Sequence, residues 1–301
     1  MKKITLISFI IFGCFSVTQA QQDPIYAQYI NNPVILNPAY TGINNLFNAN
    51  LSYRSQWSGL DGAPNTVSLA AHSSFVDNKV GVGIQFIRDE IGSTNNTQVN
   101  LSYAYKIEFG DNALSFGLQT GILSFRENND ELNVRDPDAL FTGNNNFSKF
   151  SFGAGVMLKG DDFFVGLSVP RLTNNTEDFA DLESEIYQRH FYLAGGYIYH
   201  FGTSLALKPS ALIRATADAP LSVDYNVNLV FLDKYSFGVL SRNFQTYGFL
   251  AQLNLNDNLR FGYVFEIPTG QSVGSSFNTH EITLTLDLEL LDGHFLTERY
   301  F

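Results

Sequence analysis

Apolar and polar residues alternate along this chain with a period of two. One segment has apolar residues at every second position, namely Val99, Leu101, Tyr103, Tyr105, Ile107 and Phe109. Small or polar residues fill the positions between them, namely Asn100, Ser102, Ala104, Lys106 and Glu108. Successive side chains of a strand point to opposite faces, so this pattern predicts a strand with one apolar and one polar face.

Such segments recur along the whole chain, and no comparable helical stripe follows the first twenty residues. They begin near Ala49, Thr66, Val80, Gln98, Leu114, Lys149, Phe163, Arg189, Ser204, Leu221, Tyr235, Tyr247, Leu259 and Glu281. The pattern therefore predicts about fourteen strands of roughly 8 to 13 residues each.

The connections between these segments are of two kinds. Short ones rich in Asp, Asn and Gly lie at 77–79, 110–112, 160–162, 202–203, 232–234 and 256–258. Longer ones, such as 128–146, 172–187 and 268–279, are expected to alternate strictly with them. Tight turns at one end and variable loops at the other are typical of bacterial outer-membrane barrels, with the short turns in the periplasm.

We therefore predict an all-β fold, a transmembrane antiparallel outer-membrane β-barrel of about fourteen strands, with short periplasmic turns and longer external loops. A soluble β-sandwich is the alternative, but its strands are usually shorter, about five to six residues. Segments of about ten residues match the tilted span of a hydrocarbon core. The chain ends Arg299-Tyr300-Phe301, and a terminal aromatic resembles the assembly signal of such barrels.

Composition and charge agree with this prediction. The chain is 45% hydrophobic and has 27 Phe and 15 Tyr, yet no apolar run after Val17 is long enough for a membrane helix. Its net charge is −11, which argues against nucleic acid as a partner, because phosphates would be repelled.

The first twenty residues predict a cleavable secretory signal peptide. Lys2 and Lys3 precede an apolar run that ends at Val17, and Ala20 supplies a small residue at the cleavage position. Cys14 is the single cysteine, and the bulky Phe12 disfavours a lipoprotein signal around it. The mature chain then contains no disulfide, thiolate metal site or cysteine nucleophile. We divide the chain into a signal peptide (1–20), a periplasmic N-terminal motif segment and candidate plug (21–47), and the barrel (48–301).

The sequence offers little enzymatic chemistry. His72, His190, His200, His280 and His294 show no metal-ligand spacing, and no GxSxG or GxGxxG motif precedes a helix. His72 beside Ser73 and Ser74 is the one candidate nucleophile neighbourhood. We expect no catalytic residues, no cofactor and no metal, and hence no enzyme.

Two further features have alternative interpretations. The acidic stretches 127–138 and 174–185 are interpreted as solvated external loops, with calcium binding or a protein partner as alternatives. Glycine pairs on one strand face, such as Gly81 with Gly83 and Gly153 with Gly155, are interpreted as relieving crowding inside the barrel. Charged residues expected on the lumenal face pair across strands or line a passage; they are Lys106, Glu108, Asp224, Arg260, Glu266, Asp287 and Glu289.

The segment after the signal peptide carries a specific motif. It contains Asp-Pro-x-Tyr-x-Gln-Tyr from Asp23, then Asn-Pro at 32–33, then Leu-Asn-Pro-Ala-Tyr-Thr-Gly from Leu36. The first strand adds Tyr-Arg-Ser-Gln-Trp at 53–57. Together these closely resemble the N-terminal signature of the PorP/SprF family, and the resemblance extends in pattern through the barrel strands.

This resemblance implies an outer-membrane barrel of the type IX secretion and gliding system. Members of the family assist the secretion of particular large surface proteins, often adhesins, or hold them at the cell surface. They are also thought to contact periplasmic, peptidoglycan-associated components of the system. The partners implied are thus outer-membrane lipid, a secreted surface protein and those periplasmic components.

The residues expected to matter most are in the motif. They are Asp23, Pro24, Tyr26, Gln28, Tyr29, Asn32, Pro33, Asn37, Pro38, Tyr40, Gly42, Arg54 and Trp57. The motif is expected to be ordered, because its prolines fix extended or turn geometry. It plugs the barrel, binds a partner directly, or does both, with Arg54 and Trp57 helping to seat it. The alternative function is a porin-like or fatty-acid-channel-like barrel for small solutes.

Overall fold

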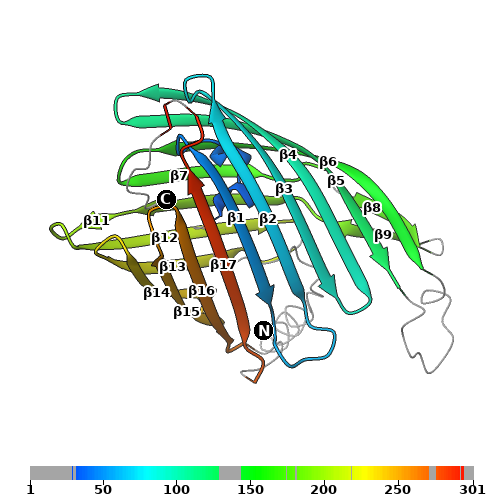
Figure 1. Ribbon diagram of the computed structural model, residues 1–301. Coiled ribbons are helices and arrows are strands. Elements are labelled where there is room, and N and C mark those ends of the chain that lie inside the picture. The colour runs from blue at the N-terminus through cyan, green and yellow to red at the C-terminus, as the bar shows by residue number, and fades with distance from the viewer. Residues whose placement is uncertain are drawn as a thin grey trace, which may run out of the picture.

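The computed structural model describes Tyr29 and residues 32–128, 144–173, 175–179, 182–217, 219–270, 276–291 and 293–294. Within these ranges, fourteen antiparallel strands close into one barrel (Figure 1). They are β1 (Phe47–Ser55), β2 (Asn65–Phe75), β3 (Val80–Ile91), β4 (Thr94–Phe109), β5 (Asn112–Glu127), β6 (Asn145–Lys159), β7 (Phe163–Val169), β10 (His190–Tyr197), β12 (Leu205–Thr216), β13 (Ser222–Phe231), β14 (Tyr235–Arg242), β15 (Thr246–Asn254), β16 (Leu259–Pro268) and β17 (Thr279–Leu288).

The barrel closes by pairing its first strand with its last. β1 lies antiparallel to β17 with Ser52 opposite Thr283, and β10 pairs with β12 on the far side of the wall. Each expected strand start lies within a few residues of an observed one, for instance Ala49 against Phe47. The predicted all-β barrel is therefore confirmed.

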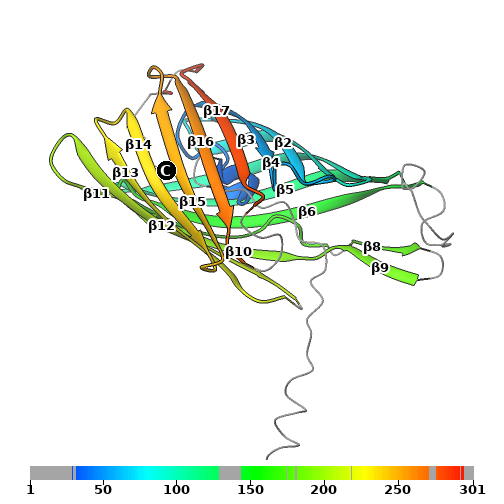
Figure 2. The ribbon, with the colours of Figure 1, turned by 90° about the horizontal axis from the view of Figure 1, so that it is seen from below.

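Five short elements lie outside the ring. η1 (Pro33–Ile35) and η2 (Pro38–Tyr40) are single 3₁₀ turns before the first strand, and β11 (Tyr199–His200) extends the hairpin that leads into β12. β8 (Asn175–Phe179) and β9 (Leu182–Tyr187) pair only with each other (Figure 2). This hairpin lies within the longer connection expected at 172–187.

The two ends of the barrel differ, as expected. The turn end carries the connections 76–79, 110–111, 160–162, 198–204, 232–234 and 255–258. The loop end carries 56–64, 92–93, 128–144, 170–189, 217–221, 243–245 and 269–278. The strict alternation of lengths is wrong at two places, 92–93 and 243–245. Positive φ at Gly92, and at both Asn243 and Phe244, allows a tight hairpin turn there.

The inward and outward faces follow the alternation in the sequence. On β4, Leu101 and Tyr103 are half exposed, whereas Asn100 and Ser102 between them are buried. Lipid therefore contacts the apolar set, and the interior is lined by amide and hydroxyl side chains.

The chain continues beyond the last strand. β17 ends at Leu288, and the terminal Phe301 is outside the described residues. The segment after β17 stays at the turn end, where Asn78 Nδ2 donates to the carbonyl of Gly293 at 2.8 Å.

Candidate functional site

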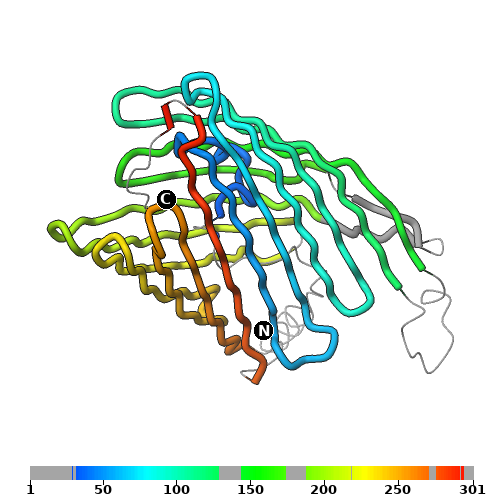
Figure 3. Tube along the Cα trace, in the orientation of Figure 1, coloured from blue at the N-terminus to red at the C-terminus, as the bar shows by residue number. Residues whose placement is uncertain are grey.

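The segment from Asn32 to Leu46 lies inside the barrel (Figures 1 and 3). Val34, Ala39 and Tyr40 are all buried there. Tyr29 is also buried, whereas Asp23, Pro24, Tyr26 and Gln28 are outside the described residues, as is the predicted signal peptide. The later half of the predicted motif is thus an interior element.

The two Asn-Pro pairs of the motif explain its local shape. Pro33 and Pro38 each occupy the first position of a 3₁₀ turn, where a fixed φ helps and no N–H is needed. Asn37 caps the second turn, because its Oδ1 accepts the N–H of Ala39 at 2.9 Å. The same side chain donates from Nδ2 to the carbonyl of Val156 in β6 at 3.2 Å. Asn37 therefore shapes the segment and attaches it to the wall.

Glycines in the wall let the backbone of the segment approach closely. A Cβ at Gly117 of β5 would overlap the backbone between Pro38 and Ala39, and one at Gly81 of β3 would overlap the carbonyl of Thr41. The interpretation that Gly81 relieves crowding inside the barrel is confirmed, and Gly117 has the same role. Any larger side chain at Gly117 must displace the segment.

Polar side chains of the wall satisfy the backbone of the segment. Gln85 Nε2 donates to the carbonyl of Val34 at 2.8 Å, and Ser168 Oγ donates to the carbonyl of Leu36 at 2.7 Å. Since this backbone has no strand partner, these bonds replace a ladder.

His72 is another wall residue that binds the segment. Its Nδ1 accepts the N–H of Gly42 at 3.1 Å, and its ring packs edge-on against Tyr40 with centroids 5.7 Å apart. Ser73 Oγ bonds to the carbonyl of Ser74, so His72 and Ser73 do not form a nucleophile pair. The histidine that was a catalytic candidate therefore holds the motif.

Apolar contacts pack the segment against the wall on both sides of the interior. Val34, Ala39, Tyr40 and Ile43 form one buried cluster with Ala70, Met157, Phe164, Ile198 and Ala206. These wall residues extend from β2 round to β12, so the segment contacts both sides of the barrel. Tyr29 packs separately against Tyr192 and Leu212, and burial raises the pKa of its phenol above its ordinary value.

Lysines fix the point where the segment joins the wall. Lys106 of β4 donates to the side chain of Asn45, and Lys159 of β6 donates to that of Asn44. Asn44 in turn donates to Tyr40 Oη at 2.7 Å. Both lysines are near the turn end of their strands, so the segment meets β1 there.

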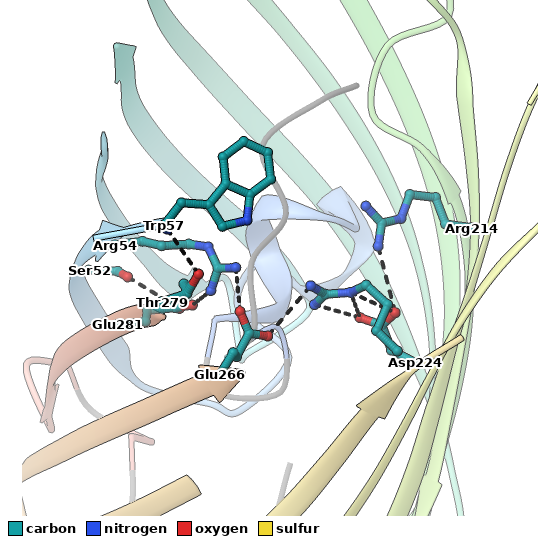
Figure 4. Close-up of polar contacts among 9 residues, drawn as sticks. Ser52, Arg54, Trp57, Arg214, Asp224, Glu266, Thr279 and Glu281 are labelled. Carbon is teal, nitrogen blue, oxygen red and sulfur yellow. Dashed lines mark hydrogen bonds and ion pairs between the residues drawn. The ribbon is translucent and has the colours of Figure 1, made fainter. Parts of the chain in front are cut away.

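Arg54, predicted to help seat the motif, lies in a buried ion-pair chain (Figure 4). Its two terminal nitrogens bind Glu266 of β16 at 2.5 Å and Glu281 of β17 at 3.0 Å. All three side chains are no more than 3% exposed, so the charges are compensated by one another rather than by water.

The chain of ion pairs continues along the wall of the barrel. Arg242 of β14 contacts Glu266 at 3.5 Å and binds Asp224 of β13 through Nε and Nη2 at 2.9–3.0 Å. Arg214 of β12 reaches the same aspartate at 3.7 Å. Charges of alternating sign therefore link β1 to β12 on the inside of the barrel.

Trp57 lies just beyond β1 at the loop end. It has a positive φ of 52°, and its backbone N–H donates to Thr279 Oγ1 at 3.2 Å (Figure 4). The contact fastens the 56–64 connection to β17. No described contact joins Trp57 to the motif segment.

The charged residues expected in the lumen are mostly placed correctly. Asp224, Glu266 and Asp287 are buried, and Arg260 binds Asp287 at 3.0 Å across β16 and β17. Glu289 instead follows the end of β17 and is exposed.

Several interior partners were missed by the sequence analysis. Glu281 was named only as the start of an expected strand, and Arg214 and Arg242 were not singled out. The alternation of inward and outward side chains along a strand could have identified Arg242 as an interior residue. Arg242 occupies the same face of β14 as the buried Leu240.

Two features are absent from the described residues. No group of three or more His, Cys, Asp or Glu side chains there is placed to hold a metal ion. In that same part of the chain, no helix is long and apolar enough to cross a membrane.

A closed barrel with an apolar outer face and a polar interior defines an outer-membrane β-barrel. The chain belongs to the family described as type IX secretion system membrane protein PorP/SprF, which matches residues 18–286. The resemblance seen in the motif is thus confirmed. No curated protein matches the chain significantly.

Solved outer-membrane proteins share the fold at low sequence identity. Acinetobacter baumannii Omp33 is 9% identical, with a TM-score of 0.50, over 82% of this chain and 100% of that one. The Ralstonia pickettii toluene transporter TbuX is 9% identical, with a TM-score of 0.49, over 84% of this chain and 92% of that one. Escherichia coli outer membrane phospholipase A is 11% identical, with a TM-score of 0.41, over 83% of this chain and 99% of that one. The likeness to Omp33 concerns the fold alone.

Proposed function

We propose that this protein is a non-enzymatic outer-membrane barrel of the type IX secretion system, closed from within by its N-terminal motif segment. In this role it assists the secretion or the surface attachment of a specific large surface protein, such as an adhesin. The observation that carries the proposal is the position of the motif, since its described residues from Asn32 to Gly42 fill the barrel.

A barrel filled in this way is a scaffold rather than a passage. The cluster around Tyr40 joins opposite sides of the wall, and Asn37 and His72 bind the segment to two different strands. The interior surface is therefore occupied by the chain itself, which leaves the two ends to engage partners. We assign the loop end to the surface protein and the turn end to periplasmic, peptidoglycan-associated components.

The non-enzymatic part of the proposal is supported by the buried serines. Ser74 Oγ lies 3.2 Å from His294 Nε2 and donates to Asn78 Oδ1 at 2.7 Å. Ser74 is fully buried, however, and His294 Nδ1 has no acceptor to orient the ring. A substrate cannot reach this hydroxyl, so the pair is a contact that fastens the C-terminal segment to β2.

The proposal is tested by deleting the gene and measuring the surface proteins. Mass spectrometry of the released and cell-surface fractions should show the loss of one large protein, while other type IX substrates remain. Crosslinking and pull-down from native membranes should recover that protein or periplasmic subunits of the system.

Two complemented strains provide matched controls. The lipid-facing variant Leu118→Ala should restore the missing protein, whereas Gly117→Val, which displaces the segment, should not. Normal surface proteins in the deletion strain would contradict the proposed function.

A further inference from the structure

Four neighbouring strands extend beyond the apolar band at the loop end of the barrel. Their outward residues lie directly opposite one another and so form rows across β3, β4, β5 and β6. The last apolar row is Phe86, Val99, Ile122 and Phe150; the two rows beyond it are polar, namely Arg88, Thr97, Ser124 and Ser148, then Glu90, Asn95, Arg126 and Asn146. Contact with lipid therefore ends at the row of Phe150, and the end of this sheet lies in water.

One edge of this sheet has no partner strand. β6 pairs with β5 over residues 145–159, but with β7 only over residues 154–159. The carbonyl of Phe152 accepts the N–H of Leu172 at 2.7 Å, so the backbone groups of every second residue from Phe152 point away from β5. The N–H and C=O groups of Phe150, Ser148 and Asn146 therefore face a side on which no described strand pairs with β6.

The chain's own next segment is directed away from this edge. Pro170 follows β7 and has no N–H to continue the ladder. Its carbonyl lies over the inner face of β6, where a Cβ at Gly153 would overlap it, and accepts Nε2 of the buried Gln119 at 3.2 Å. After Leu172 the chain forms β8 and β9, which pair only with each other. Contacts on the inner side of the wall thus leave the edge of β6 open.

The open edge is exposed and has a physical need for a partner. Phe150 is 68% exposed, and Ser148 and Asn146 are exposed as well. The backbone groups of a strand are obligatory donors and acceptors, and an open edge is a template for a further strand. The need is greatest at Phe150, because the lipid beside it offers no hydrogen bonds.

The two faces of this edge define the side chains that an added strand needs. On the inner face, Phe147 packs against the buried Leu123 and Phe125, and its ring is stacked on Phe125 with centroids 4.8 Å apart. On the outer face, the corresponding side chains are those of Ser148 and Asn146. An added strand therefore needs apolar side chains beside Phe147 and polar side chains beside Ser148.

We propose that the edge of β6 from Asn146 to Phe150 binds an extended segment of the secreted surface protein, which adds a strand to the sheet through backbone hydrogen bonds. Up to Val169, β7 occupies the position beside β6, so the space in line with it admits a single extended segment rather than the wall of a second barrel. The polar rows place this space outside the membrane, on the side assigned to the surface protein. The inference rests on the proposed function and deepens it, since it names the contact that the loop end makes.

Photo-crosslinking in native outer membranes tests the contact. Ser148→benzoylphenylalanine should crosslink to the surface protein that is lost from the deletion strain, within one extended segment of that protein. Thr97→benzoylphenylalanine is the matched control, because Thr97 lies in the same polar row but on a strand that is paired on both sides; it should give no such crosslink. Equal crosslinking from both positions, or none from Ser148→benzoylphenylalanine, overturns the proposal. Crosslinks to the chain's own β8–β9 hairpin, or to a second copy of the chain, also overturn it, because the edge then has a different occupant.

A pair of substitutions at one position tests the role of the backbone. Ser148→Pro removes an N–H that faces the open edge and keeps the bonds between β6 and β5, which the alternate residues make. The complemented strain should lose the surface protein, whereas Ser148→Ala, which keeps the N–H, should retain it. Heat-modifiable migration on gels shows whether each barrel has folded, and normal surface protein with a folded Ser148→Pro barrel contradicts the proposal. If the Ser148→Pro barrel does not fold, the crosslinking result decides.

The two proposals fail separately. Loss of the surface protein in the deletion strain, together with a missing crosslink from Ser148→benzoylphenylalanine, removes this inference and leaves the proposed function. Normal surface proteins in the deletion strain remove the proposed function and this inference with it.

Discussion

Arg54 illustrates how a single inward residue can connect distant parts of the sequence. It lies on the first strand and binds carboxylates from the last two strands of the barrel. Asn37 has a comparable double role within the motif, as the cap of η2 and as a donor to β6. Each of these side chains is buried with its partners, so removal of one leaves another polar group unsatisfied.

Arg54→Ala should strongly destabilise the barrel. The change leaves Glu266 and Glu281 buried with less compensation, and breaking a buried pair in this way costs about 3–5 kcal/mol. Arg88→Ala is the matched control, because the Arg88–Glu90 pair is about half exposed and such pairs contribute roughly 0–1 kcal/mol. Urea unfolding of the refolded barrels in detergent measures both, and equal losses would contradict the ion-pair account.

Asn37→Leu should loosen the interior segment without unfolding the wall. It removes the cap on Ala39 and the bond to Val156, a loss of about 1–3 kcal/mol in local stability. Hydrogen exchange of the amides in 36–41 should speed up while the exchange of β5 and β6 stays unchanged. Unchanged exchange in 36–41 would show that the cap does not hold the segment.

Gly117→Val should displace η2 from the wall. The added side chain occupies the space of the Pro38–Ala39 backbone, whereas a Cβ at Gly195 would meet its nearest atom at an ordinary 3.4 Å. Gly195→Ala is therefore the control. Limited proteolysis should cut the Gly117→Val protein within 32–46 and leave the control intact; equal resistance of both would contradict the observed packing.

At the scale of elements, the period-two pattern was sufficient to place the strands, because lipid on one side and a filled interior on the other enforce it. Tight turns at 92–93 and 243–245 were missed. Phe244 is not a typical turn residue, and Gly92-Ser93 is followed by the polar residues Thr94 to Thr97, which resemble a longer loop. Extended or turn geometry was predicted at the prolines of the motif, but the 3₁₀ turns η1 and η2 were not located, because each depends on an Asn-Pro pair that is stabilised by wall contacts far away in sequence. Gln85, Ser168 and His72 are the wall residues that hydrogen-bond to the segment. They could not be paired with the motif without knowing the strand order.

The whole molecule depends on the pairing of β1 with β17. In the observed register, Ser52 faces Thr283 inside the barrel, and a shift by two residues would place Thr285 or Glu281 opposite Ser52. The same register brings Arg54 opposite Glu281, so closure of the barrel and formation of the ion-pair chain depend on each other.

This register can be tested by oxidation. The pair Ser52→Cys and Thr283→Cys should form a disulfide, because directly opposed residues of an antiparallel pair have Cα atoms about 4.5–5.5 Å apart. The pair Ser52→Cys and Thr285→Cys should not. A shift in gel mobility under non-reducing conditions reports the bond, and the reverse result would indicate a different closure.

The central claim is that the N-terminal segment closes the barrel from within, and planar-bilayer conductance tests it most directly. The intact protein should show no steady open-channel current, because Val34, Ala39 and Tyr40 pack across the interior. A variant that lacks residues 21–44 should insert as a barrel and conduct. Steady open-channel current through the intact protein would contradict the account and favour a pore for small solutes.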